Sequence, residues 1–446
     1  MDSSQSKLFL WSLTASLAGF LFGFDTIVIS GAEQTIQELW KLSPGQHGFA
    51  MSSALIGMVF GSLFGAFPTD TFGRKKVLLA IGLLYFVSAI WSALTNDLYS
   101  FAIARFLGGI GVGISTVAAP LYISEISPAA KRGRLAGLFQ FSIVFGVLVA
   151  YISNNLLSGV GDDGWRWMLG IEALPAVIYS ILCLTIPESP RWLLTRKNDR
   201  DQGMKILALI NPTADQDDLA QIASNIATPK QKEKSSGSLW RSGLQRPILL
   251  AFLIAFFNQL SGINAVLYFA PRIFELTGLE KSSALLQTIG IGITNLAFTF
   301  VGLWLIDRVG RRTLLIIGSI GYIASLSLCS WAFFAQNFTI VPLCIFAFIA
   351  SHAVGQGAVI WTFISEIFPN QHRAAGQALG TGTHWVFAAL ITFLFPIMVK
   401  AVPTGYIFAF FAFMMVLQLL WVKLMVPETK GKTLEELGSE LRLGKQ

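Results

Sequence analysis

Twelve apolar runs constrain this chain more than any other feature of its sequence. Each run is long enough for a helix to cross the hydrocarbon core of a bilayer, which takes about 20 residues. Only 13% of the residues are charged, against roughly a quarter in soluble domains. The sequence therefore predicts an all-α membrane protein with twelve transmembrane helices. The runs are 8–30, 48–68, 77–95, 98–124, 135–157, 167–186, 247–275, 284–306, 313–334, 340–367, 377–401 and 405–425.

Basic residues gather in every second connection between these runs. By the positive-inside rule, these connections and both termini face the cytoplasm. This orientation accounts for the net charge of +7, so the charge does not indicate nucleic-acid binding. The first run is long and has no small-residue cleavage pattern, which argues against a cleaved signal peptide. The basic connections hold Arg74-Lys75-Lys76, Lys131-Arg132-Arg134, Arg311-Arg312, Arg373, the stretch 187–246 and the C-terminal tail.

The chain also repeats itself. "PTDTFGRKK" at 68–76 matches "LIDRVGRRT" at 305–313, "YISEISP" at 122–128 matches "FISEIFP" at 363–369, and "IPESP" at 186–190 matches "VPETK" at 426–430. The three offsets, 237 to 241 residues, are nearly equal. We predict two parallel six-helix bundles, 1–186 and 247–425, followed by a cytoplasmic tail at 426–446. Parallel repeats of this kind occur in membrane transporters, whose substrate sites lie near the midplane between the repeats.

The polar stretch 187–246 joins the two predicted bundles. Its pattern predicts short amphipathic cytoplasmic helices at 200–210 and 216–226. It is either a solvated linker or a latch that rests on the cytoplasmic faces of the bundles.

The repeated motifs place arginines and carboxylates at cytoplasmic helix ends. Glycine permits a tight turn there, and the arginine after it can fork onto a carboxylate of a neighbouring helix. If such pairs join helices that separate during transport, they form a cytoplasmic gate; otherwise they anchor topology as weak surface pairs. The predicted gate residues are Asp70, Arg74, Glu125, Arg134, Glu188, Asp307, Arg311, Glu366, Arg373 and Glu428.

In its motifs the whole chain resembles the sugar porter family of the major facilitator superfamily. The matching segments occur in the family's order: "GRKK", "PLYISEISPAAKRGRL", "PESPRWLL", "QLSGINAVLYFAP", "DRVGRR", "ISEIFPNQHRAAGQAL" and "PETKGKTLEEL". The family includes bacterial proton–sugar symporters and animal facilitative glucose carriers. The resemblance implies two pseudo-symmetric six-helix bundles.

A sugar site needs side-chain amides, which both donate and accept hydrogen bonds, and aromatic faces. In a regular helix Asn264 would point about 140° away from Gln259, but Ser261-Gly262 between them can break the helix. Alternatively, each amide only forms hydrogen bonds between transmembrane helices and does not bind sugar. Asn258 and His384 stand where the family commonly has Gln, so direct sugar contact by Asn258 is open, and His384 either hydrogen-bonds or senses pH. The resemblance implies sugar binding by Gln140, Gln259, Asn264, Asn295 and Trp361, with Trp385 lining the cavity and Tyr268 closing the extracellular side.

Ionisable residues inside the spans are rare, which makes Asp25 in the first and Arg105 in the fourth notable. The resemblance implies that Asp25 carries the proton and Arg105 modulates it, since passive carriers usually have Asn at this position. A static Asp25–Arg105 pair is the alternative. Glu172 matches an acidic position common to both kinds of carrier, and we assign it to the cytoplasmic gate.

We therefore predict a secondary transporter of a monosaccharide, a hexose such as glucose, that works by alternating access with proton symport. The alternatives are passive sugar uniport, transport of a polyol, and a non-transporting sugar receptor. We expect no enzyme activity, cofactor or metal; Cys183, Cys329 and Cys344 lie in spans. The expected partners are sugar, proton and lipid bilayer, with the monomer as functional unit. The expected location is a cell membrane, and short loops favour a bacterial inner membrane.

Overall fold

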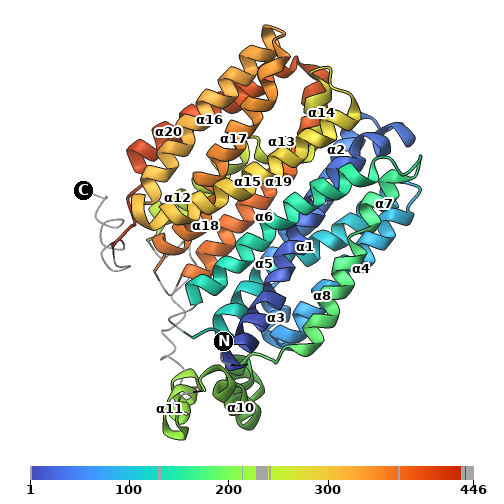
Figure 1. Ribbon diagram of the computed structural model, residues 1–446. Helices are drawn as coiled ribbons and strands as arrows, with labels where there is room; N and C mark the ends of the chain where they lie inside the picture. Colours follow the sequence, from blue (N-terminus) through green and yellow to red (C-terminus); the bar gives the residue numbers. More distant parts are fainter. Residues whose placement is uncertain are drawn as a thin grey trace. The chain divides into compact units, whose positions relative to one another are not determined.

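The computed structural model describes residues 3–128, 132–212, 214–227, 240, 243–369, 372–432 and 437, and these residues are helical or lie in turns and loops (Figure 1). Twelve helices in this part of the chain are long and apolar enough to span a membrane. The predicted all-α membrane class is confirmed. The first span is longer than predicted, because α1 continues through polar residues to Leu39.

The first half of the chain forms the following helices: α1 Ser3–Leu39, α2 Pro44–Phe64, α3 Ala66–Phe72, α4 Arg74–Leu94, α5 Leu98–Ile126, α6 Arg132–Leu157, α7 Gly164–Gly170 and α8 Ala173–Thr185. The second half forms α12 Gln245–Leu260, α13 Ile263–Tyr268, α14 Ala270–Glu275, α15 Lys281–Val309, α16 Arg311–Phe334, the 3₁₀ turn η4 Phe338–Ile340, α17 Val341–Val354, α18 Gln356–Ile367, α19 Arg373–Ala401 and α20 Thr404–Met425.

Three spans are interrupted by breaks in their helices. The sixth is divided into α7 and α8, the seventh into α12 and α13, and the tenth into α17 and α18. The break in the seventh span falls at Ser261-Gly262, as predicted, and Gly262 takes a left-handed φ of +84° that favours glycine. In the tenth span Gly355 separates the two helices. Such breaks free backbone groups and change the direction of side chains in the middle of a span.

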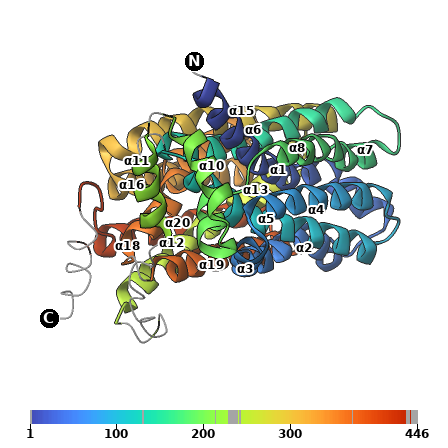
Figure 2. The same ribbon diagram turned by 90° about the horizontal axis from the view of Figure 1, so that it is seen from below.

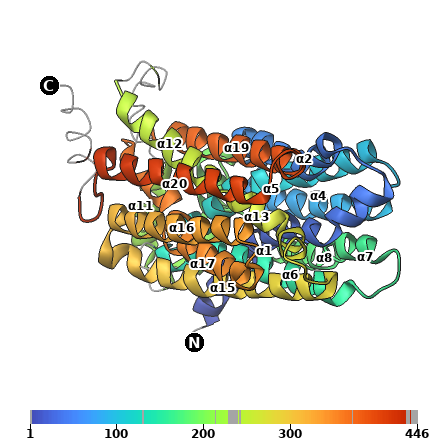
Figure 3. The same ribbon diagram turned by 90° about the horizontal axis from the view of Figure 1, so that it is seen from above.

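The chain packs as two compact units, which we describe separately. Unit 1 holds 1–26, 56–150 and 166–233; its α4 lies beside α5 and α8 (Figure 1). Unit 2 holds 27–55, 151–165 and 234–446; its α16 lies beside α17 and α20 (Figure 3). Unit 2 therefore contains the ends of α1 and α6 and the beginning of α2, packed with second-half helices. The bundle boundaries predicted from the repeat remain a prediction.

The connection after the sixth span contains short helices, as predicted. They are α9 Pro190–Trp192, the π-helical turn η2 Leu193–Lys197, α10 Arg200–Ile210 and α11 Gln216–Ala227. In the view from below, α10 and α11 lie toward the viewer (Figure 2). Leu194, Leu207, Leu219 and Ala223 form a small apolar core between them. The indole of Trp192 donates to the backbone O of Asp70, which ties this layer to α3.

Candidate functional site

The break in the seventh span brings the predicted amides together. Asn264 Nδ2, on α13, donates to Gln259 Oε1, on α12, at 2.6 Å. A Cβ at position 262 would lie 2.5 Å from the Phe411 ring, so the turn needs glycine for space as well as for its φ. The expectation that Ser261-Gly262 reorients Asn264 is confirmed.

Gln259 is the centre of this amide cluster. Its Nε2 lies 2.9 Å from Asn258 Oδ1 and 3.1 Å from His384 Nε2, and its side chain is fully buried. The second half thus places three amides and an imidazole from α12, α13 and α19 against one another. Amides used in this way offer paired donors and acceptors, which suits hydroxyl groups of a ligand.

Aromatic rings border the cluster on the side of His384. The ring centroids of Trp361, on α18, and His384 are 5.0 Å apart, and those of His384 and Trp385 are 4.7 Å apart. Trp361 stays half-buried, whereas Trp385 is 4% exposed. Amides beside indole faces match both the polar and the apolar surfaces of a sugar ring.

The remaining predicted site residues are placed less directly. Asn295 is half-buried in the middle of α15, without a hydrogen bond to the cluster among the described residues. Gln140 is half-buried on α6 in unit 1, whereas the cluster belongs to unit 2. Tyr268 is 1% exposed near the end of α13. Their roles in binding and gating remain predictions.

Sequence analysis missed a second imidazole in this half. His352, on α17, lies with its Nδ1 2.5 Å from the hydroxyl oxygen of Tyr322, which is buried on α16. The signal was present, since "IASHAVG" places a polar ring inside an apolar span just before the break at Gly355. His352 lacks a matching partner in the first-half repeat, which is why the comparison of halves did not single it out.

The first half carries the predicted buried ion pair. Arg105 Nη1, on α5, donates to Asp25 Oδ1, on α1, at 2.5 Å, and both side chains are at most 2% exposed. Arg105 Nη2 also donates to the backbone O of Asp25 at 2.8 Å. A buried carboxylate and guanidinium relieve each other's desolvation only in such close geometry.

Glu172 lies beside this pair, and its role in the cytoplasmic gate remains a prediction. It lies at the break between α7 and α8, is 1% exposed, and interacts electrostatically with Asp25 and Arg105. Neither Glu172 oxygen nor Asp25 Oδ2 accepts a hydrogen bond from a described donor. Two buried carboxylates thus share one guanidinium, which leaves one surplus negative charge unless a proton is bound. The sixth-span break, which sets this position, has no strong sequence signal.

The first copy of the repeated motif forms a closed set of charges at the start of α4. Glu188 Oε1 accepts from the backbone N of Arg74 at 2.9 Å and of Lys75 at 3.2 Å. A carboxylate at this position suits the positive end of a helix. The Arg74 side chain forks onto Glu125, with Nε–Oε2 at 2.9 Å and Nη2–Oε1 at 3.1 Å, and lies 3.2 Å from Asp70.

The second copy repeats this geometry at the start of α16. Glu428 accepts from the backbone N of Arg311 at 2.9 Å, and Arg311 forks onto Glu366 at 3.2 and 2.9 Å and pairs with Asp307 at 3.0 Å. In each copy a glycine precedes the arginine, with φ of +93° at Gly73 and +101° at Gly310.

Each of these sets lies within one unit, so the pairs hold helices of the same half together. Of the other predicted gate residues, Arg373 begins α19 and makes no ion pair among the described residues. The side chain of Arg134 lies outside the described part of the chain. The gate itself remains a prediction.

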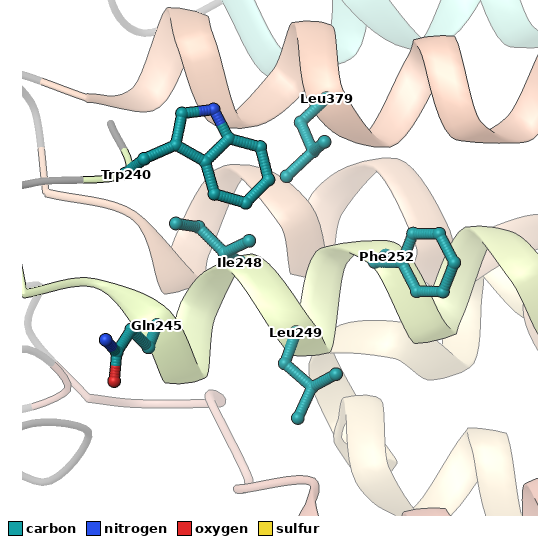
Figure 4. Close-up of a pocket in the computed structure, with 6 residues that line it drawn as sticks. All are labelled: Trp240, Gln245, Ile248, Leu249, Phe252 and Leu379. Atoms are coloured by element: carbon teal, nitrogen blue, oxygen red, sulfur yellow. The ribbon is translucent and has the colours of Figure 1, made fainter. Parts of the chain in front are cut away.

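An apolar pocket of about 320 Å³ lies elsewhere, at the beginning of α12 (Figure 4). It is lined by Trp240, Gln245, Ile248, Leu249, Phe252 and Leu379. Gln245 is its one amide, and none of the cluster residues lines it. This pocket is not the candidate site. Within the described residues there is also no group of three or more His, Cys, Asp or Glu side chains that could hold a metal.

Comparisons with known proteins agree with this geometry. A family model described as "Sugar (and other) transporter" matches residues 11–441. The chain is a sugar porter of the major facilitator superfamily. The arabinose-proton symporter of Bacillus subtilis (strain 168) is 35% identical over 447 residues, covering 97% of this chain and 95% of the relative. The D-xylose-proton symporter of Escherichia coli (strain K12) is 35% identical over 474 residues, covering 97% and 96%.

The fold of this sugar porter matches solved structures of the family. The partially occluded inward open conformation of the xylose transporter XylE from E. coli aligns with a TM-score of 0.84 at 33% identity, covering 96% of this chain and 100% of that one. The predicted family and major facilitator fold are confirmed. The sugar porter is a multi-pass cell membrane protein, and its relatives and structural neighbours are transporters.

Proposed function

We propose that this protein carries a monosaccharide across the membrane together with a proton, by alternating access. The observation that carries the proposal is the buried Asp25–Glu172–Arg105 group with its surplus negative charge. A buried unpaired charge is costly, and a proton between the two carboxyls removes it. The proton-coupled relatives, named for arabinose and xylose, support the same reading.

Sugar binds, in this proposal, at the cluster around Gln259. Gln259, Asn264, Asn258 and His384 supply donors and acceptors, and Trp361 and Trp385 supply ring faces. We keep Asn295 and Gln140 as further proposed sugar ligands. We propose a hexose such as glucose as the substrate, with the pentoses named for the relatives as the competitors to test.

Coupling follows from linkage between charge and conformation. With the proton absent, Arg105 must stay on Asp25, because it is the cation that pairs with that carboxylate in the described part of the chain. With the proton bound, the group is neutral and Arg105 can move without leaving an unpaired charge. Proton binding therefore shifts the equilibrium between conformations, and the conformation that binds sugar best shifts with it.

The orientation and the gate complete the proposal. The positive-inside rule places both termini and the Arg74 and Arg311 sets on the cytoplasmic side. We call the opposite ends of the spans the outer ends. These sets would then stabilise the packing of the cytoplasmic helix ends in one conformation, while the monomer supplies the whole pathway.

Passive uniport of the same sugars is the second candidate, favoured by the close Asp25–Arg105 geometry, which a static pair would also show. The two are separated by reconstituting the protein in liposomes that contain a pH dye and adding sugar outside without an imposed gradient. Symport predicts sugar-dependent acidification of the interior. Sugar entry without proton movement would establish uniport, and no sugar entry with retained binding would indicate a receptor.

A further inference from the structure

A second group of buried charges lies at the outer end of α1, away from the proposed proton site. Glu33 is fully buried there. Arg272, on α14, forks onto it, with Nε–Oε1 at 3.0 Å and Nη2–Oε2 at 2.9 Å. His47 Nε2, on α2, lies 2.9 Å from Glu33 Oε2, and His47 is also fully buried.

These contacts join helices from the two halves of the sequence. Glu33 and Arg272 are 239 positions apart, yet both belong to the compact unit 2. Gln37, one turn after Glu33, accepts a further hydrogen bond from Arg272 Nη2. Lys281, at the start of α15, donates to Thr35 of α1 at 3.1 Å. The outer end of the first span is therefore bound to α14 and to the start of the eighth span.

Arg272 lies just beyond the outer end of the broken seventh span, on α14. The chain runs from Gln259 through the left-handed Gly262 to α13, which carries Asn264, and then to α14, which carries Arg272. Phe269, between α13 and α14, packs its ring against His47 at a centroid distance of 5.8 Å. The same short segment thus holds a sugar-site amide at one end and the Glu33 partner at the other.

Burial of these charges is costly, and an apolar contact of the same shape would hold the helices at least as well. An ion pair differs from an apolar contact in what happens when it opens. If water enters between α1 and α14, both charges are hydrated, so separation costs less than for side chains that would expose apolar surface. A buried, bidentate pair of this kind suits a contact that is made and broken repeatedly.

We propose that Glu33 and Arg272 form an outer latch, a contact that holds the outer entrance closed and is released when α14 moves away from α1. His47 and Gln37 orient the two groups. Glu33 and Arg272 are positioning residues, because neither contacts the amide cluster. The latch sets how often the outer entrance is open. It affects sugar affinity because α14, which carries Arg272, is joined directly to α13, which carries Asn264.

The expected effect of the latch on sugar affinity rests on the proposed transport function. The latch itself is tested without sugar, by a distance measurement. Spin labels at Lys41→Cys and Glu280→Cys, both exposed, report the separation of the outer ends by pulsed electron resonance. The double variant Glu33→Gln/Arg272→Gln removes both charges together, so no unpaired charge is left buried. We expect a second, longer distance population in this variant, absent or minor in the parent.

A transport measurement gives the second readout. Apparent affinity falls in proportion to the fraction of molecules in the competent state, so opening the entrance more often raises apparent affinity from outside. The double variant should lower the half-saturation concentration for outside sugar about fivefold or more, within the usual range of coupling between sites. A merely structural role would lower the maximal rate and leave the half-saturation concentration unchanged.

Glu38→Gln is the matched control, since it removes a carboxylate from the same helix end at an exposed position. It should leave both readouts at parental values. An unchanged distance distribution in the folded double variant would overturn the latch, whatever the protein transports. A changed distance distribution without any sugar transport would support the latch and contradict the proposed function.

Discussion

Arg105 holds residue 25 through two separate contacts: Nη1 donates to the Asp25 carboxylate at 2.5 Å, and Nη2 donates to its backbone oxygen at 2.8 Å. The second contact does not depend on the side chain at position 25. An amide oxygen at this position can still accept from Nη1. Asp25→Asn should therefore preserve the packing of α1 against α5 while removing the group that binds the proton, which makes it a clean test of coupling.

Gln259→Ala should weaken sugar binding at least about tenfold, or 1.4 kcal/mol. The substitution removes the central amide and leaves Asn264 Nδ2 and Asn258 Oδ1 without their partner. Titration calorimetry with purified protein measures the effect. Gln418→Ala is the control, because Gln418 is an equally buried amide that contacts Gln356 and Ser319 instead. It should lower thermal stability and leave affinity unchanged; equal loss of affinity in both variants would remove Gln259 from the site.

Gly310→Ala should destabilise the protein more than Gly278→Ala. Both glycines have a positive φ, +101° and +88°, so both alanines pay the strain of that conformation. A Cβ at 310 would also lie 2.5 Å from Glu428 Oε2, whereas nothing lies within 4 Å of one at 278. Thermal unfolding in detergent separates the two contributions. Equal melting temperatures of the two variants would mean that the close approach of Glu428 to position 310 does not contribute to stability.

Arg74→Gln combined with Arg311→Gln should open the cytoplasmic helix ends. Arg74 forks onto Glu125, which is 4% exposed, and Arg311 forks onto Glu366, which is 25% exposed. Without the arginines, each glutamate is left without its cation beside the other carboxylates of its set. A cysteine placed at the half-buried Ser365 should react faster with a polar maleimide. Arg196→Gln is the control, since that arginine is 61% exposed. An unchanged labelling rate in the double variant would rule out the gate.

Glu275→Gln should stabilise the protein at neutral pH. Burial raises the pKa of the Glu275 carboxyl above its usual value, so the folded state binds the proton more tightly than the unfolded state. Stability from this group is then present at low pH and is lost as pH rises through the folded pKa. The variant should melt on the order of 1–3 °C higher at pH 7 and equally at pH 4. A difference at pH 4 would show that the effect is not electrostatic.

Local sequence signals predicted the parts of the site that depend on local backbone geometry. Ser261-Gly262 indicated the break that brings Asn264 to Gln259, because glycine permits the φ of +84° found there. The matched Gly-Arg and Glu motifs indicated that Arg74 and Arg311 fork onto carboxylates, because both partners recur at one offset. The short helices at α10 and α11 followed from their amphipathic pattern.

Contacts between distant spans were predicted less well. The place of Glu172 beside Asp25 was not predicted, because no local pattern shows that the sixth span breaks at this residue. Glu33 and Arg272 lie near span ends, where charges are usually hydrated, yet Glu33 is fully buried and its partner Arg272 is only 22% exposed. The physical cause is the same in both cases, since burial of a charge depends on which helix faces it.

The most direct test of proton coupling compares wild type with Asp25→Asn in liposomes. Sugar accumulation is measured under an imposed inward proton gradient, and exchange of labelled sugar is measured without a gradient. We expect wild type to accumulate sugar above the external concentration. We expect Asp25→Asn to exchange sugar at a rate near that of wild type without accumulating it. Accumulation by Asp25→Asn equal to that of wild type would contradict the account, as would a wild type that only equilibrates its sugar.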